Sequence, residues 1–504
     1  MKPLATGHQG GRRPMTLTAG SIFLAMAVAS PAFADPLGPW SGSQVALAGA
    51  TQVWRTQLPL GYTQAIRSYD LVGGYLYALG DDGWIRAVRP DTGEHIWSRP
   101  VARPLDALWP PAAGRVAGAP AVVFALLENA VFLDPLTGRE LKRLRLDGTT
   151  TAGVVASDKH VFQVGPGGHV RCIRIKDGVT GWGVGLPATI AMAPVYRGDA
   201  DEMVVVADTQ GTLVALSSTE HKYFMRSLGQ APSGKLGSDR LAVYVATNDG
   251  LLHAIERSTG DLLWHYSMVD RPEGGPVVTA TALYQATTGG GLYRFDIAQA
   301  AFLATRPAAG PPLEDAAGVS AAVPDKLPTT DPSNQPQASA AVHDRARIDA
   351  ARDIRRWYLP AGKKFLAEWP ERIVVLQTDG RIAMIPRDSV DGQPAELLDL
   401  GPVEGAVSNT WNDAVILTSP RGDIRCLRPI GGKPLTPADF GVPAASQPAA
   451  SQPAATATGQ PGQGGARAAT SPAQAGSEVT PPAPRGQDTL LTDPLRSRKA
   501  PPPQ

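Results

Sequence analysis

The sequence predicts an all-β fold, a single eight-bladed β-propeller whose blades are four-stranded antiparallel sheets. Three observations predict it: a recurring motif, two columns of apolar residues that run through every copy of the motif, and a lone strand sequence ahead of the first copy. Neighbouring copies are about 40 residues apart, except across one insertion, and this period fits a four-stranded blade. One closed ring can therefore account for most of this 504-residue chain without further domains.

The motif is most complete in residues 82–97 and 249–264. Both read Asp-Gly, then a run of strand formers, then Thr-Gly, with a tryptophan four residues after the second glycine. Residues 168–182 follow the same frame. Five weaker copies have their first turn at Glu128, Gly211, Gly290, Gly380 and Gly422. Asp-Gly and Gly-Gly favour tight hairpins because glycine tolerates positive φ, and we expect the tryptophan to pack on the adjacent blade from the outer strand.

Two columns test whether the copies share one structure. Two residues after the turn stand Ile85, Ala130, Val170, Leu213, Leu252, Leu292, Ile382 and Ile424. Five residues after it stand Val88, Leu133, Ile173, Leu216, Ile255, Phe295, Ile385 and Leu427. Both columns are apolar throughout, and they lie on opposite faces of a strand because side chains alternate. A strand that is apolar on both faces lies between two sheets, as a propeller blade lies between its neighbours.

The two ends of the repeat region predict how the ring closes. The eighth copy, around Gly422, lacks the Thr-Gly and the tryptophan, and prolines follow it. Ahead of the first copy, residues 53–56 read Val-Trp-Arg-Thr, an outer-strand sequence that belongs to no copy. We therefore expect this N-terminal strand to complete the last blade, which hides strand edges that would otherwise pair with other chains. The propeller is expected over residues 50–432.

The N-terminus predicts a signal peptide over residues 1–34. Basic residues come first, residues 15–29 are apolar, and a small-x-small site ends at Ala34, where we expect cleavage. This predicts a periplasmic or secreted protein. An uncleaved membrane anchor is the alternative, but residues 15–29 are short for a span and no later segment is long and apolar enough, so no transmembrane span is expected. The net charge of +1 argues against a nucleic-acid partner.

Two segments are expected outside the ring. Residues 304–357 form a predicted mobile insertion between the sixth and seventh copies, and within it residues 343–357 predict a helix. Its basic residues include Arg352, Arg355 and Arg356. They suggest a docking element, and a solvated helix packing on its own propeller is the alternative. The tail at 441–504 is rich in Pro, Ala and Gln, carries no aromatic residue, and is expected to be disordered.

The frame of residues 82–97 and 249–264 resembles the repeat of the pyrroloquinoline-quinone (PQQ)-like β-propeller family. One branch of that family, the quinoprotein dehydrogenases, holds PQQ and a calcium ion in the central funnel, with adjacent cysteines and a group of carboxylate and amide ligands. Here the only cysteines, Cys172 and Cys426, are far apart, and no such ligand group aligns. The other branch is non-enzymatic and includes the propeller of the outer-membrane β-barrel assembly machinery, usually a lipoprotein, whereas this sequence lacks a lipobox cysteine.

The leading hypothesis is thus an exported, monomeric scaffold of the cell envelope that binds a protein or glycan partner and performs no catalysis. We expect no cofactor and no catalytic or metal-binding residues. A quinoprotein-like dehydrogenase using PQQ and calcium is the alternative. Arg86, Arg171 and Arg425 recur three residues after the turn. They either line a polar channel that binds a ligand or are salt-bridged residues of the wall.

Overall fold

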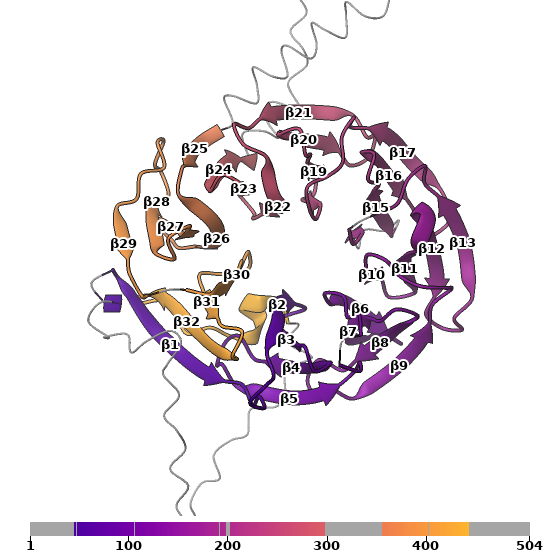
Figure 1. Ribbon diagram of the computed structural model, residues 1–504, viewed down its shortest axis with the longest axis horizontal. Coiled ribbons are helices and arrows are strands. Elements are labelled where there is room, and N and C mark those ends of the chain that lie inside the picture. The colour runs from indigo at the N-terminus through magenta and orange to yellow at the C-terminus, as the bar shows by residue number, and fades with distance from the viewer. Residues whose placement is uncertain are drawn as a thin grey trace, which may run out of the picture. The chain divides into compact units, whose positions relative to one another are not determined.

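The computed structural model describes residues 45–297 and 355–442, apart from residues 47, 105, 191, 198–201 and 402. In this part of the chain, eight four-stranded antiparallel sheets stand around a ring (Figure 1). The predicted eight-bladed β-propeller is therefore confirmed. Within each blade the strands follow one another from the centre of the ring to its rim (Figure 1).

The bounds of the elements follow the repeat. Blade one consists of β2 (Ile66–Val72), β3 (Tyr75–Gly80), β4 (Trp84–Val88) and β5 (His95–Pro100), and blade two of β6 (Ala112–Val116), β7 (Ala119–Ala125), β8 (Asn129–Leu133) and β9 (Glu140–Arg145). Blade three consists of β10 (Val154–Ala156), β11 (His160–Val164), β12 (His169–Arg174) and β13 (Thr180–Gly185), and blade four of β14 (Val195–Arg197), β15 (Met203–Ala207), β16 (Thr212–Leu216) and β17 (Lys222–Ser227). Blade five consists of β18 (Gly237–Ser238), β19 (Ala242–Ala246), β20 (Leu251–Glu256) and β21 (Leu262–Ser267), and blade six of β22 (Pro272–Val278), β23 (Ala282–Thr287), β24 (Gly291–Asp296) and β25 (Arg355–Leu359). Blade seven consists of β26 (Gly362–Glu368), β27 (Arg372–Gln377), β28 (Ile382–Pro386) and β29 (Glu396–Leu398), and blade eight of β30 (Gly405–Val407), β31 (Val415–Thr418), β32 (Asp423–Pro429) and β1 (Ala50–Gln57). Two short 3-10 turns, η1 (Pro166–Gly168) and η2 (Pro437–Phe440), complete the described elements.

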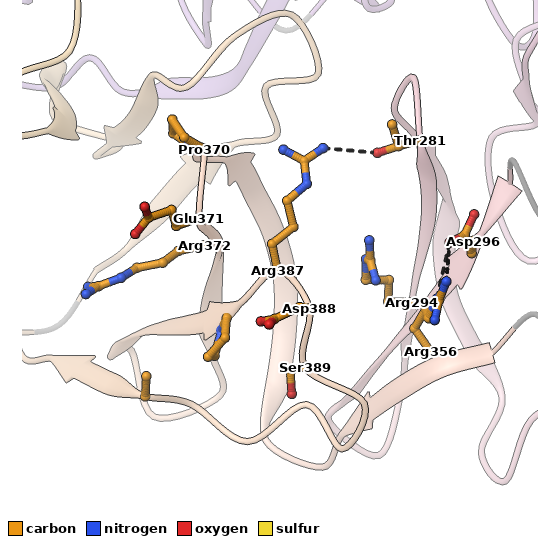
Figure 2. Close-up of a pocket in the computed structure, with 12 residues that line it drawn as sticks. Thr281, Arg294, Asp296, Arg356, Pro370, Glu371, Arg372, Arg387, Asp388 and Ser389 are labelled. Atoms are coloured by element: carbon orange, nitrogen blue, oxygen red, sulfur yellow. Dashed lines mark hydrogen bonds and ion pairs between the residues drawn. The ribbon is translucent and has the colours of Figure 1, made fainter.

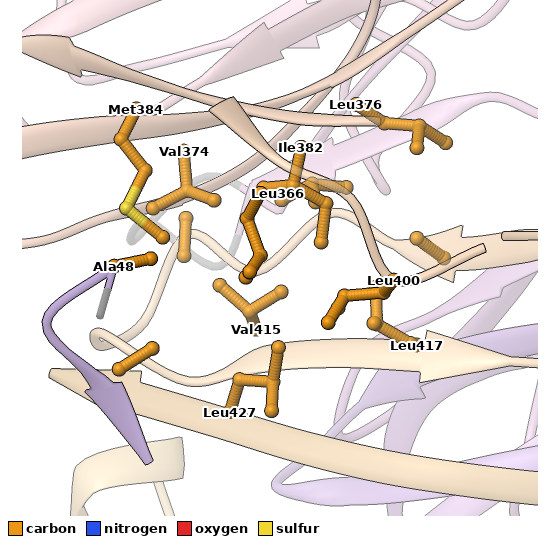
Figure 3. Close-up of a cluster of buried hydrophobic side chains, with 14 of the residues drawn as sticks. Ala48, Leu366, Val374, Leu376, Ile382, Met384, Leu400, Val415, Leu417 and Leu427 are labelled. Atoms are coloured by element: carbon orange, nitrogen blue, oxygen red, sulfur yellow. The ribbon is translucent and has the colours of Figure 1, made fainter. Parts of the chain in front are cut away.

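The hydrophobic core is divided into layers, each shared by two neighbouring blades. Eight such clusters of buried side chains occur, one at every junction around the ring. Between blades seven and eight, Val374 and Met384 pack against Val415 and Leu427, and Ala48 joins them from the segment before β1 (Figure 3). Burial of apolar surface between sheets is what holds the blades together. Both apolar columns predicted from the sequence belong to these layers.

The outer-strand tryptophans pack on the next blade, as predicted. The indole of Trp97 on β5 donates its Nε1 hydrogen to the Pro135 carbonyl oxygen at 2.9 Å. Its ring lies against Gly138 of the second blade, where a Cβ atom would stand only 2.6 Å from a ring carbon. Trp54 of β1 has the same relation to Gly93 of the first blade. The Thr-Gly glycine and the tryptophan of the repeat are therefore two halves of one contact.

The N-terminal strand closes the ring. β1 pairs antiparallel with β32 over its whole length, and Trp54 stands opposite Cys426 (Figure 1). Arg55 also reaches the Asp423 carboxylate of β32, with Nε at 2.9 Å from Oδ1. The predicted completion of the last blade by residues 53–56 is confirmed.

One expectation about blade six is wrong. The helix expected over 343–357 does not extend to its last three residues, because Arg355–Leu359 forms β25, the fourth strand of this blade. Trp357 and Leu359 are buried while Tyr358 between them is only half-buried, which is the alternation of a strand. The insertion therefore falls inside blade six, between β24 and β25, rather than between two copies. The rest of the expected helix, including Arg352, lies outside the described residues.

The C-terminal end of the described chain adds an element that the sequence did not predict. After β32, η2 brings Phe440 into the layer between blades eight and one, where it is fully buried. Val442 joins the next layer, between blades one and two. Residues 441 and 442, assigned to the tail from composition, thus pack on the ring. The predicted signal peptide at 1–34, the remaining tail at 443–504 and most of the insertion lie outside the described residues. No helix among the described residues has the length and apolar character to cross a bilayer.

Candidate functional site

A pocket opens between blades six and seven. Its volume is about 890 Å³, and arginines from both blades converge on it (Figure 2). Its walls are Thr281, Arg294, Asp296, Arg356, Pro370, Glu371, Arg372, Pro386, Arg387, Asp388, Ser389 and Ala395. Pockets with a few convergent polar groups are the usual places where a rigid fold binds a ligand.

The topology of the blades brings these residues together. Antiparallel strands reverse direction at each turn, so the turns between first and second strands and between third and fourth strands share one face of the ring. We call it the insertion face, because β24 ends and β25 begins there. Thr281 comes from the β22–β23 turn, residues 370–371 from the β26–β27 turn and residues 387–389 from the β28–β29 turn. The pocket is therefore a product of two neighbouring blades and of no single repeat.

Three of the four arginines in the pocket are held by carboxylates. Arg356 Nη2 lies 2.9 Å from Asp296 Oδ2, within the same blade. Arg387 Nη2 lies 3.0 Å from Glu368 Oε2, and Arg372 Nη1 lies 2.6 Å from Glu396 Oε2. Charged pairs of this kind fix long side chains in one position.

Arg294, the fourth arginine, is different. Its side chain starts on β24 opposite Trp357 of β25 and is only 6% exposed. It contacts the hydroxyl of Tyr284, and its Nε atom has no hydrogen-bond partner. Burial, and then the charge of Glu368, raises the pKa of Tyr284 well above its usual value, so this hydroxyl stays protonated and donates to Glu368 Oε1 at 3.0 Å. Figure 2 shows the Arg294 guanidinium between Arg387 and Arg356.

The three recurring arginines of the sequence are ion-paired in the blades. They occupy the third strands β4, β12 and β32, two strands away from the innermost ones. The pairs are Arg86 Nη2 to Asp82 Oδ2 at 2.7 Å, Arg171 Nε to Asp147 Oδ2 at 3.3 Å, and Arg425 Nη2 to Asp423 Oδ2 at 3.0 Å. This is the geometry of salt-bridged residues of the wall, and a binding role for them stays a prediction.

Of the two predicted docking arginines that the structure describes, Arg355 and Arg356, only Arg356 lines the pocket. Arg355 lies on the exposed side of β25 and bonds the Tyr266 hydroxyl at 3.1 Å. Arg294, Arg372 and Arg387 were missed in the sequence. Arg294 carries a signal there, because the equivalent position four residues after the turn is apolar in the seven other blades, as Ala87, Phe132, Cys172, Ala215, Ala254, Met384 and Cys426.

The described residues do not fit the PQQ and calcium site that the family resemblance implies. Cys172 and Cys426 are free thiols in blades three and eight, and burial raises the pKa of each to about 12, which leaves them unreactive. Within residues 45–297 and 355–442, no three His, Cys, Asp or Glu side chains group as metal ligands. The described residues therefore offer no adjacent cysteines and no carboxylate cluster that could hold PQQ and calcium.

Comparison with known proteins supports the same fold. The family model described as outer membrane protein assembly factor BamB matches residues 127–311, from the second blade to beyond β24. The resemblance to the PQQ-like family is confirmed. No curated protein matches the sequence.

Solved structures with a similar fold share little sequence. BamB from Moraxella catarrhalis is 14% identical with a TM-score of 0.49, and the match covers 75% of this chain and 99% of that one. The computationally designed Ika8 protein is 15% identical with a TM-score of 0.50, over 74% of this chain and 98% of the other. At these identities the likeness concerns the fold alone.

Proposed function

We propose that this chain is an exported scaffold of the cell envelope that binds a protein partner on the insertion face of its ring. One observation carries the proposal: an open pocket between two rigid blades, with arginines held in place by ion pairs. The match of residues 127–311 to the model of an outer membrane assembly factor supports an envelope location. Function resides in sites added to a fold, so the pocket is the part of the ring to test.

Export completes this proposal. A signal peptide over residues 1–34, cleaved after Ala34, would deliver the ring to the periplasm or beyond the cell. We propose a monomer there, because blade eight is completed by the chain's own β1 and leaves no unpaired partner for a second copy at that junction. A glycan is the other class of partner for an exposed pocket.

Photo-crosslinking in cells tests the proposal. A photoreactive amino acid at Val390, in the β28–β29 turn beside Ser389, projects from the pocket rim because this position is 75% exposed. Ser258, exposed in the β20–β21 turn of blade five, is the matched control on the same face. We expect one discrete protein adduct from position 390 in the envelope fraction and none from position 258. Equal labelling at both positions, or recovery of the chain in the cytoplasm, would contradict the proposal.

Catalysis by a quinoprotein is tested separately. The mature chain is incubated with PQQ and calcium and passed over a desalting column. Because the described residues lack the ligand set, we expect no quinone absorbance to elute with the protein. If the quinone absorbance elutes with the protein and the protein oxidises alcohols in a dye-linked assay, the chain is a dehydrogenase and the scaffold proposal is wrong.

A further inference from the structure

Arg294 is exceptional among the buried arginines of the described chain. Four arginines there are less than a tenth exposed, and three of them pair with aspartates. Those pairs are Arg86 with Asp82, Arg425 with Asp423, and Arg428 with Asp413. Arg294 has the Tyr284 hydroxyl and no carboxylate within 4.0 Å among the described residues. A buried guanidinium without a paired carboxylate is unfavourable, so Arg294 points to an anion that none of the described residues supplies.

A second orphan donor lies at the same junction. The indoles of Trp54, Trp97 and Trp182 donate to a carbonyl of the following blade. The equivalent Nε1 of Trp357 is buried and has no partner. Trp357 stands directly opposite Arg294 in the sheet. The junction of blades six and seven therefore leaves two buried donors, Arg294 Nε and Trp357 Nε1, without a hydrogen-bond partner.

We propose that this pocket binds a carboxylate of an acidic peptide segment, with Arg294 as its counter-charge. The partner's being a protein rests on the function proposed above. The nearby charges favour a monoanion: four arginines face Asp296, Glu371 and Asp388 in the pocket wall, and Glu368 and Glu396 behind it. Three of these arginines pair with Asp296, Glu368 and Glu396, so Arg294 is the one positive charge left unpaired, and it matches the single charge of a carboxylate better than the two charges of a phosphate. The planar guanidinium of Arg294 carries one positive charge, and its paired N–H donors fit the two oxygens of a single carboxylate.

The shape of the pocket favours a peptide over a small free acid. The cavity of about 890 Å³ far exceeds one carboxylate and opens to the solvent on the insertion face. Pro370, Pro386 and Ala395 give its walls apolar surface for the stems of neighbouring side chains. The exposed Val390 extends this apolar surface at the rim. Recognition of acidic motifs by arginines in open grooves is a recurring mode of peptide binding.

The test compares two arginine variants of the mature, full-length chain. The probe is a fluorescein-labelled oligoglutamate peptide, followed by fluorescence anisotropy, with oligoglutamine as the neutral peptide. Arg294→Met keeps the volume of the side chain and removes its charge. Arg174→Met is the control, because Arg174 pairs with Asp177 in a turn on the insertion face of blade three. We expect Arg294→Met to weaken oligoglutamate binding roughly tenfold or more, and Arg174→Met to change it less than about twofold.

Melting temperature separates ligand binding from a structural role. Removing a buried, uncompensated cation relieves an unfavourable charge, so Arg294→Met should melt at or above the wild-type temperature. Oligoglutamate should raise the melting temperature of the wild type and leave that of Arg294→Met unchanged. A strong drop in melting temperature for Arg294→Met would overturn the inference, because it would make Arg294 a structural support of Tyr284.

Other results would also overturn it. Equal affinity of wild type and Arg294→Met for oligoglutamate would remove Arg294 from the site. Inorganic phosphate that displaces the probe better than free glutamate would make it a phosphate site. If oligoglutamate fails to bind while position 390 still crosslinks a partner, this inference falls and the proposed function stands. If oligoglutamate does not bind and position 390 does not crosslink a partner, both this inference and the proposed function are wrong.

Discussion

At the level of single residues, Trp97 and Gly138 explain why the repeat keeps its second glycine. Gly138 has a φ of +64°, a conformation that side chains with a Cβ rarely adopt. Its missing side chain is also the space that the Trp97 ring fills. Two independent reasons, backbone and packing, therefore require glycine at this place.

A pair of glycine variants separates the two reasons. Gly138→Ala places a Cβ 2.6 Å from the Trp97 ring and should cost about 3 kcal/mol or more of unfolding free energy, through strain and lost packing. Gly148→Ala has a similar φ of +80° and no atom within 4 Å, so it should cost only about 1–2 kcal/mol. Urea denaturation measures both. Equal losses would mean that the tryptophan contact contributes nothing.

His253 makes the stability of blade five sensitive to acid. Burial, and then the neighbouring His265, lowers its pKa to about 4 from an ordinary value of 6.5. Between pH 6.5 and 4, His253 is protonated in the unfolded chain but stays neutral in the folded chain. The free energy of unfolding therefore decreases as the pH drops toward 4, by up to about 3 kcal/mol. His253→Val should lose less stability between pH 7 and 5 than the wild type in urea denaturation, whereas the exposed His169→Val should behave as the wild type does. Parallel pH profiles for wild type and His253→Val would show that this histidine is protonated without penalty.

At the level of elements, the repeat predicted the third strand of blade six but not its fourth strand. The sixth copy has its turn at Gly290 and its strand β24, but its tryptophan comes only after the insertion. In the sheet, Trp357 pairs with Arg294 as Trp97 pairs with Ala87 in blade one. The insertion thus separates the fourth strand of this blade from its third strand along the chain. A helix was expected instead, because Ala346, Ala350, Ile354 and Trp357 recur at the spacing of one helical face, with arginines around it.

The predictable part of the fold is the part encoded locally. Turn glycines, apolar columns and the lone strand at residues 53–56 each act within one blade or at its edge, so they predicted the blades and the closure of the ring. The pocket was beyond such patterns, because Arg294, Arg372 and Arg387 come from three separate strands and turns. The packing of Phe440 was missed for a related reason. Its neighbours are prolines and small residues, and only the fully folded junction of blades eight and one offers it a place.

At the level of the whole molecule, ring closure couples blades that are distant in sequence. In an open stack each repeat contacts only its neighbours, and the end repeats lack a partner on one side. Here the eighth layer joins blades eight and one, with Trp54, Ile416 and Phe440 packed against Leu76 and Val88. Every blade therefore has two neighbours, and the loss of any one layer exposes apolar surface on both sides. We expect such a ring to unfold as one cooperative unit.

Deletion of β1 tests this cooperativity. Removing residues 50–57 takes away the outer strand of blade eight, the Trp54 contact with Gly93 and the ion pair of Arg55 with Asp423. Loss of one buried tryptophan side chain alone costs about 3–5 kcal/mol, a large share of the 5–15 kcal/mol that is typical of whole domains. We expect a sharply lower melting temperature, and a calorimetric enthalpy that exceeds the van't Hoff enthalpy, because an opened ring can unravel from its ends. Deletion of residues 443–504, which removes none of the described strands, is the control and should leave the melt unchanged. A single sharp transition at the wild-type temperature without β1 would mean that packing between blades holds the ring together by itself.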